Sequence, residues 1–117
     1  MIFNSGTAGE AAAAKFLKKN GYRILDKNYR KTYGEIDIIA QNGENIAFVE
    51  VKTRKSDLFG TPAEFVTVKK QKRIIKAAYA YIQQHNLDAE FTFDIVEVYL
   101  DKNKIKNINH IKNAFYV

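Results

Sequence analysis

Apolar residues recur along this chain at two different spacings, and the spacings predict the order of its elements. Between Thr7 and Lys19 they return at helical intervals, and Asn20-Gly21 supplies a helix stop. Three segments rich in β-branched and apolar residues follow, and we expect strands over 22–30, 35–41 and 45–53. Asn42-Gly43, between the last two segments, is a strong hairpin signal.

The second half of the chain predicts a long helix and one or two further strands. The helix ends near His85, and either Thr67 or the segment Thr61-Pro62-Ala63-Glu64 fits its start, the latter as a separate short helix. A strand is expected over 91–100, and 105–108 is a candidate for a short final strand. The order αβββαβ(β) predicts an α/β fold of the α+β sandwich type, with a mixed central sheet flanked by helices.

Length and composition narrow the class of protein. A chain of 117 residues is expected to form one domain, 1–117, around one hydrophobic core. The absence of cysteine excludes disulfides and thiolate metal sites. No apolar run approaches the roughly 20 residues of a membrane span, and the first residues lack the basic and apolar regions of a signal peptide. We therefore expect a cytoplasmic protein without a membrane partner.

The charge balance favours a polyanionic partner. Lysine and arginine number 19 against 13 acidic residues, which gives a net charge of +6. Among polyanions, nucleic acid is the expected partner. The candidate phosphate contacts lie on one side of the second helix and beside the strands: Lys69, Lys72, Arg73, Lys76, Arg30 and Arg54. The alternative interpretation of the helix residues is an ordinary solvated surface.

Two acidic residues and a lysine interrupt segments that otherwise look like core strands. Side chains alternate across a strand, so Asp37 and Glu35 share one face, and Glu50 and Lys52 share a face of the next strand. A two-residue Asn42-Gly43 turn would place Glu35 opposite Glu50 and Asp37 opposite Phe48. All the charged groups would then project from one side of the sheet, with Asp37 and Glu50 as diagonal neighbours.

This constellation fits a metal-dependent nuclease. Two carboxylates about 5 Å apart repel by roughly 3 kcal/mol at an effective dielectric near 20, and a bound Mg²⁺ or Mn²⁺ reverses that sign. Asp37 and Glu50 are the predicted metal ligands, with the Val51 carbonyl as a further candidate. Lys52 would hold the scissile phosphate or lower the pKa of the attacking water. Glu10 borders the buried stripe of the first helix and could reach the same site.

Simpler interpretations exist for the same residues. Glu50 and Lys52 could form an ion pair on a solvated sheet face. Thr7 and Glu10 have the spacing of a capping box, which would explain Glu10 without any catalytic role. Glu35 has the place of a flanking charge.

At these residues the chain resembles the small bacterial family usually called YraN. It is more distantly similar to archaeal Holliday-junction resolvases and the restriction-endonuclease-like nucleases. The similarity covers nearly the whole chain, and its most specific motifs are GEIDIIA (34–40) and FVEVKTR (48–54). Further matching residues are Gly9-Glu10, Asn28-Tyr29-Arg30, Phe59-Gly60, Pro62, Lys70, Tyr81 and Phe93-Asp94. Related sequences often carry arginine where this chain has Thr92, which puts a salt-bridge or phosphate role at that position in doubt.

The resemblance implies a restriction-endonuclease-like αβββαβ core with a site formed by Glu10, Asp37, Glu50 and Lys52. The predicted activity is Mg²⁺- or Mn²⁺-dependent cleavage of DNA, on branched or flapped structures in particular. The main alternative is a nucleic-acid-binding or scaffold protein that keeps the fold without turnover, and a third is an enzyme acting on RNA. A homodimer is compatible with this interpretation.

Overall fold

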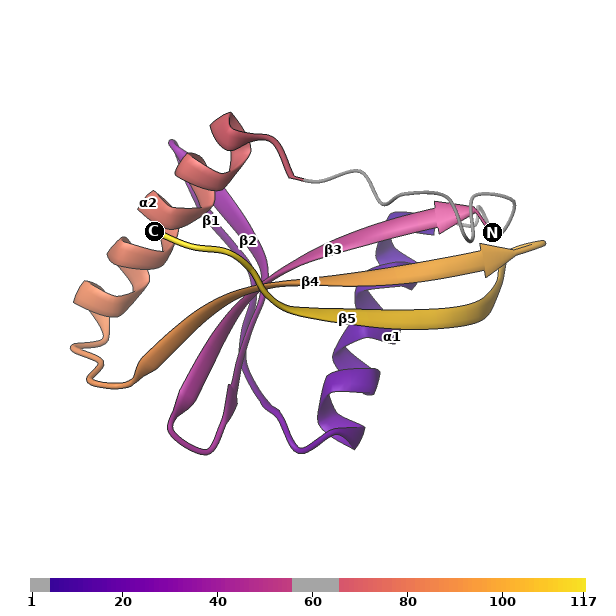
Figure 1. Ribbon diagram of the computed structural model, residues 1–117, viewed down its shortest axis with the longest axis horizontal. Helices are drawn as coiled ribbons and strands as arrows, with labels where there is room; N and C mark the ends of the chain where they lie inside the picture. The colour runs from indigo at the N-terminus through magenta and orange to yellow at the C-terminus, as the bar shows by residue number, and fades with distance from the viewer. Residues whose placement is uncertain (1–4, 56–65) are drawn as a thin grey trace.

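The computed structural model describes residues 5–55 and 66–117. Its elements follow one another as α1 (Ser5–Lys19), β1 (Arg23–Lys31), β2 (Gly34–Asn42), β3 (Asn45–Lys55), α2 (Val68–Gln84), β4 (Glu90–Asp101) and β5 (Lys104–Phe115). The expected order is confirmed, with the last strand present, and the fold is a mixed α+β sandwich (Figure 1). Neither described helix is long and apolar enough to cross a membrane.

The five strands lie in the sheet in chain order, β1-β2-β3-β4-β5. Neighbours are antiparallel except for β3 and β4, which run parallel over Asn45–Lys55 and Glu90–Leu100. A parallel pair needs a crossover connection, and α2 lies within the connection between these two strands. The sheet is therefore mixed, as expected.

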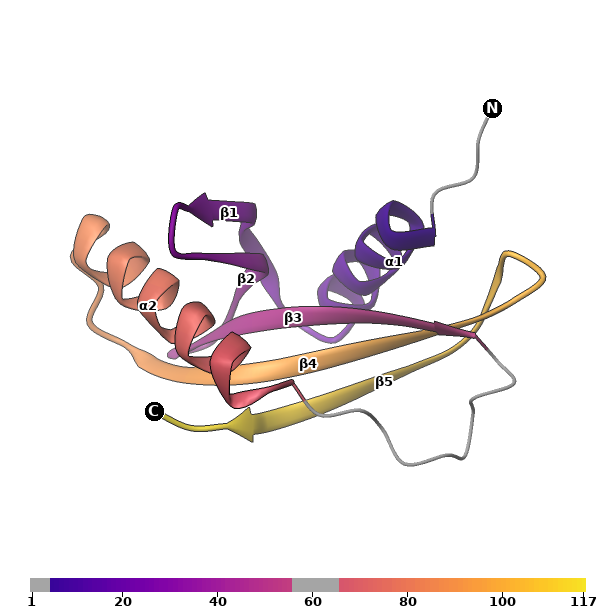
Figure 2. The ribbon, with the colours of Figure 1, turned by 90° about the horizontal axis from the view of Figure 1, so that it is seen from above.

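Two hydrophobic clusters lie on opposite faces of the sheet, each beneath one helix. The α1 cluster packs Ala13 and Leu17 against alternate residues of the strands, such as Val49. The α2 cluster packs Ile74 and Tyr81 against the other set, which includes Phe48. Because side chains alternate along β3, this division assigns each strand residue to one face, and Figure 2 shows the helices over different parts of the sheet.

Strand β2 separates from β3 partway along its length. The two strands pair from Asn42 back to Ile38, whereas β2 continues to pair with β1 as far as Gly34. In a regular strand Ile36 and Ile38 would lie on the same face of the sheet. Here Ile38 belongs to the α1 cluster and Ile36 to the α2 cluster. The start of β2 has thus twisted away from β3 and towards α2, as the course of the β1–β2 hairpin in Figure 1 shows.

Several element ends differ from the sequence prediction. Helix α1 already includes Ser5, so Thr7 lies inside its first turn and the capping-box interpretation of Glu10 is wrong. Thr67 is confirmed as the N-cap of α2, since its hydroxyl accepts a hydrogen bond from the Lys70 backbone at 3.2 Å. The alternative start at Thr61-Pro62 lies outside the described residues.

The last strand is much longer than the predicted 105–108. It covers Lys104–Phe115 and pairs with β4 through a tight turn at Lys102 and Asn103, both of which have positive φ. Two positive φ values are typical of a type I′ hairpin, which pairs long strands in register. Most residues of β5 are exposed and polar. The sequence of this strand therefore lacks the alternation of apolar and polar residues from which a strand is predicted.

A buried acid–histidine pair ties β5 to β4 on the α1 face. The Asp94 carboxylate is almost fully buried, lies 2.8 Å from His110 Nε2, and accepts the Asn113 backbone N–H at 3.1 Å. The neighbouring Thr92 accepts a hydrogen bond from the Asn45 side chain at 3.0 Å. Thr92 thus bonds to the start of β3 rather than to a charged group.

Replacing Gly34 with alanine is expected to destabilise the protein by about 1–3 kcal/mol. A Cβ at this position would overlap the backbone carbonyl of Arg73, so α2 would have to move away from β2. Chemical denaturation of the variant measures the loss. Glu44→Ala is the control, because Glu44 is exposed in the turn of the β2–β3 hairpin and its truncation should change stability by less than about 0.5 kcal/mol. Equal stability of the two variants would contradict the close packing of α2 on Gly34.

Candidate functional site

Asp37 and Glu50 come together where β2 separates from β3. Asn42 pairs with Asn45, so the turn is Gly43-Glu44 and not the predicted Asn42-Gly43. Positive φ at Gly43, the first turn residue, is typical of a type II′ hairpin. The true register is shifted by two residues, which preserves the shared face. The last observed pair is Ile38 with Val49. The next position in the same register places Asp37 directly opposite Glu50, instead of diagonal to it.

The same shift corrects the place of Glu35. This residue pairs with Arg30 across the β1–β2 hairpin rather than facing Glu50. Its carboxylate lies 3.1 Å from the Arg30 Nε, and both side chains are exposed. Glu35 is therefore a flanking charge, and Arg30 remains at the surface as expected.

The Asp37 carboxyl is held in an environment that opposes its ionisation. Burial and the nearby charge of Glu50 raise its pKa from the ordinary 3.8 to about 7, with smaller contributions from Glu10 and Glu35. The Val51 backbone N–H donates to Asp37 Oδ2 at 2.8 Å and only partly offsets these effects. Two acidic groups so close together favour a cation between them.

Glu50 has a partner that the sequence motifs do not assign to the site. The Lys70 ammonium, from the first turn of α2, lies 2.6 Å from Glu50 Oε1. Burial alone would lower the pKa of Lys70, but the hydrogen bond and charge of Glu50 outweigh it and raise the pKa. Lys70 lies four residues before Ile74, which packs in the core. Residues four apart lie on the same side of a helix, so this spacing in the sequence indicates that Lys70 faces the sheet.

Lys52 projects from the same face as Glu50. It is half-buried, and the alternation of β3 places Phe48, Glu50 and Lys52 on the α2 side. Lys52 also lies close enough to Lys70 to affect its ionisation. The structure therefore brings Asp37, Glu50 and Lys52 to one face, as the hairpin parity predicts, and adds Lys70.

Arg54, a predicted phosphate contact, is instead held in a largely buried ion pair. Its Nε lies 2.7 Å from Glu97 Oε2, and the exposed fractions of the two side chains are 12% and 2%. Glu97 also accepts a hydrogen bond from Asn109 at 3.0 Å. The reason is the parallel pairing of β3 with β4, which sets an acidic residue next to Arg54 and Lys52, a long-range contact that no local pattern reveals.

Glu10 approaches the site from α1, on the other side of the sheet. It is half-buried, and its charge contributes to the raised pKa of Asp37. Its neighbour Gly9 packs directly on Thr53 of β3. Within residues 5–55 and 66–117, however, no three acidic, histidine or cysteine side chains gather closely enough to hold a metal ion together. In this metal-free geometry Glu10 contributes charge to the pair, and its role as a third ligand stays a prediction.

The remaining pair still fits a hard divalent cation. Asp37 and Glu50 offer carboxylate oxygens, and their mutual repulsion is relieved by a bound positive charge. Mg²⁺ commonly uses one or two carboxylates and completes its shell with water and substrate phosphate. The donor set is sufficient for such a site.

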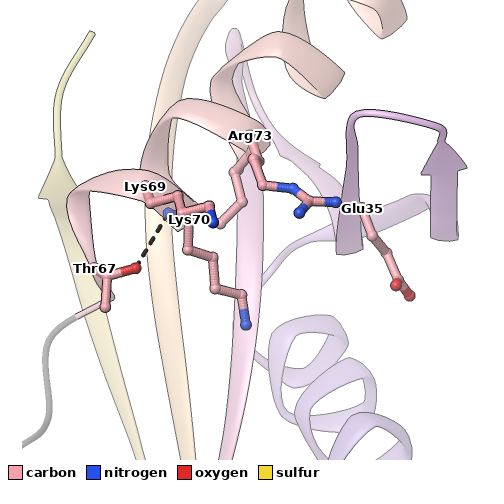
Figure 3. Close-up of a pocket in the computed structure, with 6 residues that line it drawn as sticks. Glu35, Thr67, Lys69, Lys70 and Arg73 are labelled. Carbon is pink, nitrogen blue, oxygen red and sulfur yellow. Dashed lines mark hydrogen bonds between the residues drawn. The ribbon is translucent and has the colours of Figure 1, made fainter.

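The basic residues of α2 lie on its exposed surface, and Lys70 among them reaches Glu50. A pocket of about 320 Å³ at the start of the helix is lined by Glu35, Thr67, Lys69, Lys70, Arg73 and Ile74 (Figure 3). Arg73 is partly engaged, because its Nε donates to the Tyr33 carbonyl at 3.1 Å. Lys69, Lys72 and Lys76 are exposed.

Fold and site together define an α+β protein that carries two acidic residues and two lysines on one face of a mixed sheet. The chain belongs to the uncharacterised protein family UPF0102, the YraN family, whose profile matches residues 9–98. A UPF0102 protein of Caldicellulosiruptor saccharolyticus is 48% identical over 112 residues, covering 94% of this chain and 95% of the relative. A UPF0102 protein of Alkaliphilus oremlandii is 50% identical over 113 residues, covering 94% and 96%.

One of the solved structures that match this chain is that of Pyrococcus furiosus SfsA in complex with Ca²⁺. It is 16% identical, with a TM-score of 0.39, and the match covers 92% of this chain and 62% of that chain.

Proposed function

We propose that this chain is a Mg²⁺- or Mn²⁺-dependent nuclease that hydrolyses phosphodiester bonds of DNA. The observation that carries the proposal is the convergence of Asp37 and Glu50 on one sheet face, in an environment that raises the pKa of Asp37 to about 7. Two neighbouring, largely buried carboxylates repel each other and therefore destabilise the fold unless a cation binds between them. A metal site gives that arrangement a purpose.

Each residue has a defined task in this proposal. Asp37 and Glu50 hold the cation, and the Val51 N–H fixes the orientation of the Asp37 carboxylate. Lys52 binds an oxygen of the scissile phosphate from the same face, and Glu10 adds negative charge behind the pair. When bound, the cation supplies a water of lowered pKa and stabilises charge on the phosphate.

The partner in this proposal is DNA, held by its backbone. The net charge of +6 and the exposed lysines of α2 support phosphate contacts that do not depend on base sequence. In this proposal the substrates are flapped or branched DNA structures. These substrates, and RNA as an alternative, are separated by experiment.

The proposal is tested with a cleavage panel of linear, flapped and four-way-junction DNA and single-stranded RNA, in Mg²⁺, Mn²⁺ or EDTA. Wild type is expected to cut a DNA substrate only with metal, and Asp37→Asn is expected to lose about 100-fold or more of that activity. DNA binding by the variant should persist and should weaken with salt. Glu44→Gln, which removes an exposed carboxylate at the far end of the same hairpin, is the matched control.

A non-catalytic nucleic-acid-binding protein is the second candidate, and one observation favours it. Lys70 already compensates the charge of Glu50 in the absence of metal. Under this hypothesis no substrate in the panel is cut, whereas wild type and Asp37→Asn bind DNA equally in metal and in EDTA. That combination would overturn the nuclease proposal.

A further inference from the structure

Lys70 belongs to α2, yet its ammonium contacts Glu50, a candidate metal ligand on β3. It is the third residue of α2, and the Thr67 cap fixes the start of that helix through the Lys70 backbone N–H. From there its ammonium contacts Glu50 Oε1 at 2.6 Å. The contact joins the crossover helix to β3, the strand that carries Glu50 and Lys52.

The two partners differ sharply in exposure. The Glu50 side chain is 8% exposed, whereas that of Lys70 is 46% exposed. A buried carboxylate without a compensating charge is costly, so Glu50 needs a cation at all times. A half-exposed lysine on a flexible stem can leave, because its ammonium regains water when it does.

A divalent cation and the Lys70 ammonium would compete for Glu50. Both bind the same carboxylate, and their positive charges repel at such short range. The direction in which Lys70 can move is set by the pocket at the start of α2, which Lys70 lines together with Lys69 and Arg73. Figure 3 shows the Lys70 side chain extended from the helix between Thr67 and Glu35.

We propose, building on the nuclease function above, that Lys70 is an exchangeable counter-ion of the site. In the metal-free protein its ammonium neutralises Glu50. When a divalent cation takes Glu50, Lys70 turns to the pocket and binds a phosphate oxygen of the nucleic acid. Lys70 is then a DNA contact only in the metal-loaded protein, which couples metal binding to substrate binding.

The first test is a calorimetric titration of the full chain with Mn²⁺ in the absence of DNA. Lys70→Met removes the charge and keeps an apolar stem, so Mn²⁺ no longer competes and should bind about tenfold more tightly than to wild type. Lys69→Met is the matched control: it removes a neighbouring charge of the same pocket, whereas the ion pair with Glu50 is made by Lys70, and its Mn²⁺ affinity should stay within about twofold of wild type.

The second test compares DNA affinity in two conditions, using a short flapped duplex in EDTA and in Ca²⁺, a hard cation that takes oxygen ligands. Lys70→Met should bind the duplex like wild type in EDTA and about threefold to tenfold more weakly in Ca²⁺. Lys69→Met should show the same change from wild type in both conditions.

The outcomes separate this inference from the nuclease proposal. If wild type and Lys70→Met bind Mn²⁺ with equal affinity, the counter-ion role is overturned while the metal site stands. If neither binds Mn²⁺, both proposals fall. Lys70→Arg keeps the charge and the pairing, and should therefore bind Mn²⁺ no more tightly than wild type. Tenfold tighter binding by this variant would overturn the inference, including in the case that Lys70→Met does not fold.

Discussion

Asp37→Asn is expected to make the metal-free protein more stable than wild type at alkaline pH, by an amount that shrinks as the pH falls. The folded pKa of Asp37, about 7, is above its value in the unfolded chain. The folded state therefore binds the proton more tightly, and wild type loses stability as the pH rises from the unfolded to the folded pKa. From about pH 5 to about pH 8 the loss relative to the asparagine variant should be about 2–3 kcal/mol.

Urea denaturation of both proteins in EDTA, at several pH values, measures this difference. Asparagine can still accept the Val51 N–H, so the comparison isolates the charge. Mg²⁺ or Mn²⁺ should raise the melting temperature of wild type at about pH 8 and leave that of Asp37→Asn unchanged, because only a state that binds the ligand is stabilised. Parallel pH profiles for the two proteins, together with no metal response in wild type, would make Asp37 a structural residue.

Arg54→Met is expected to cost about 3–5 kcal/mol, because it leaves the Glu97 carboxylate buried without its cation. Glu97 is 1% exposed, and hydrogen bonds from neutral side chains such as Asn109 and Tyr99 do not replace the positive charge of Arg54. Thermal and chemical denaturation measure the effect. The loss should be one of folding stability, so DNA affinity of the folded variant should stay close to that of wild type.

The exposed pair of Arg30 and Glu35 is the matched control. It has the same arginine Nε geometry, at 3.1 Å, on side chains that are 72% and 44% exposed. Arg30→Met should therefore change stability by less than about 1 kcal/mol. The double variant Arg54→Met with Glu97→Met should recover much of the loss, since no unpaired charge stays buried. A small cost for Arg54→Met alone would contradict the burial of this ion pair.

Local patterns explain most of what could be predicted from the sequence. In the first half of the chain, the spacing of apolar residues predicts the helix and strands, and Gly43 indicates the hairpin turn. The shared face of Asp37, Glu50 and Lys52 follows because side chains alternate along a strand. The error of two residues in the turn left that shared face intact, because a shift by an even number keeps every side chain on its face. The polar strand β5 was largely missed, because its stability comes from its pairing with β4 rather than from apolar alternation.

By itself, the sequence determined the order of elements, the side of the sheet that carries the acidic pair and the family to which the chain belongs. These depend on residue spacing and composition, which are local properties. The tertiary structure alone decided the partners of the charged groups: Lys70 for Glu50, and Glu97 for Arg54. Both contacts join segments far apart in the chain, and they exist because α2 crosses over the sheet to make β3 and β4 parallel neighbours.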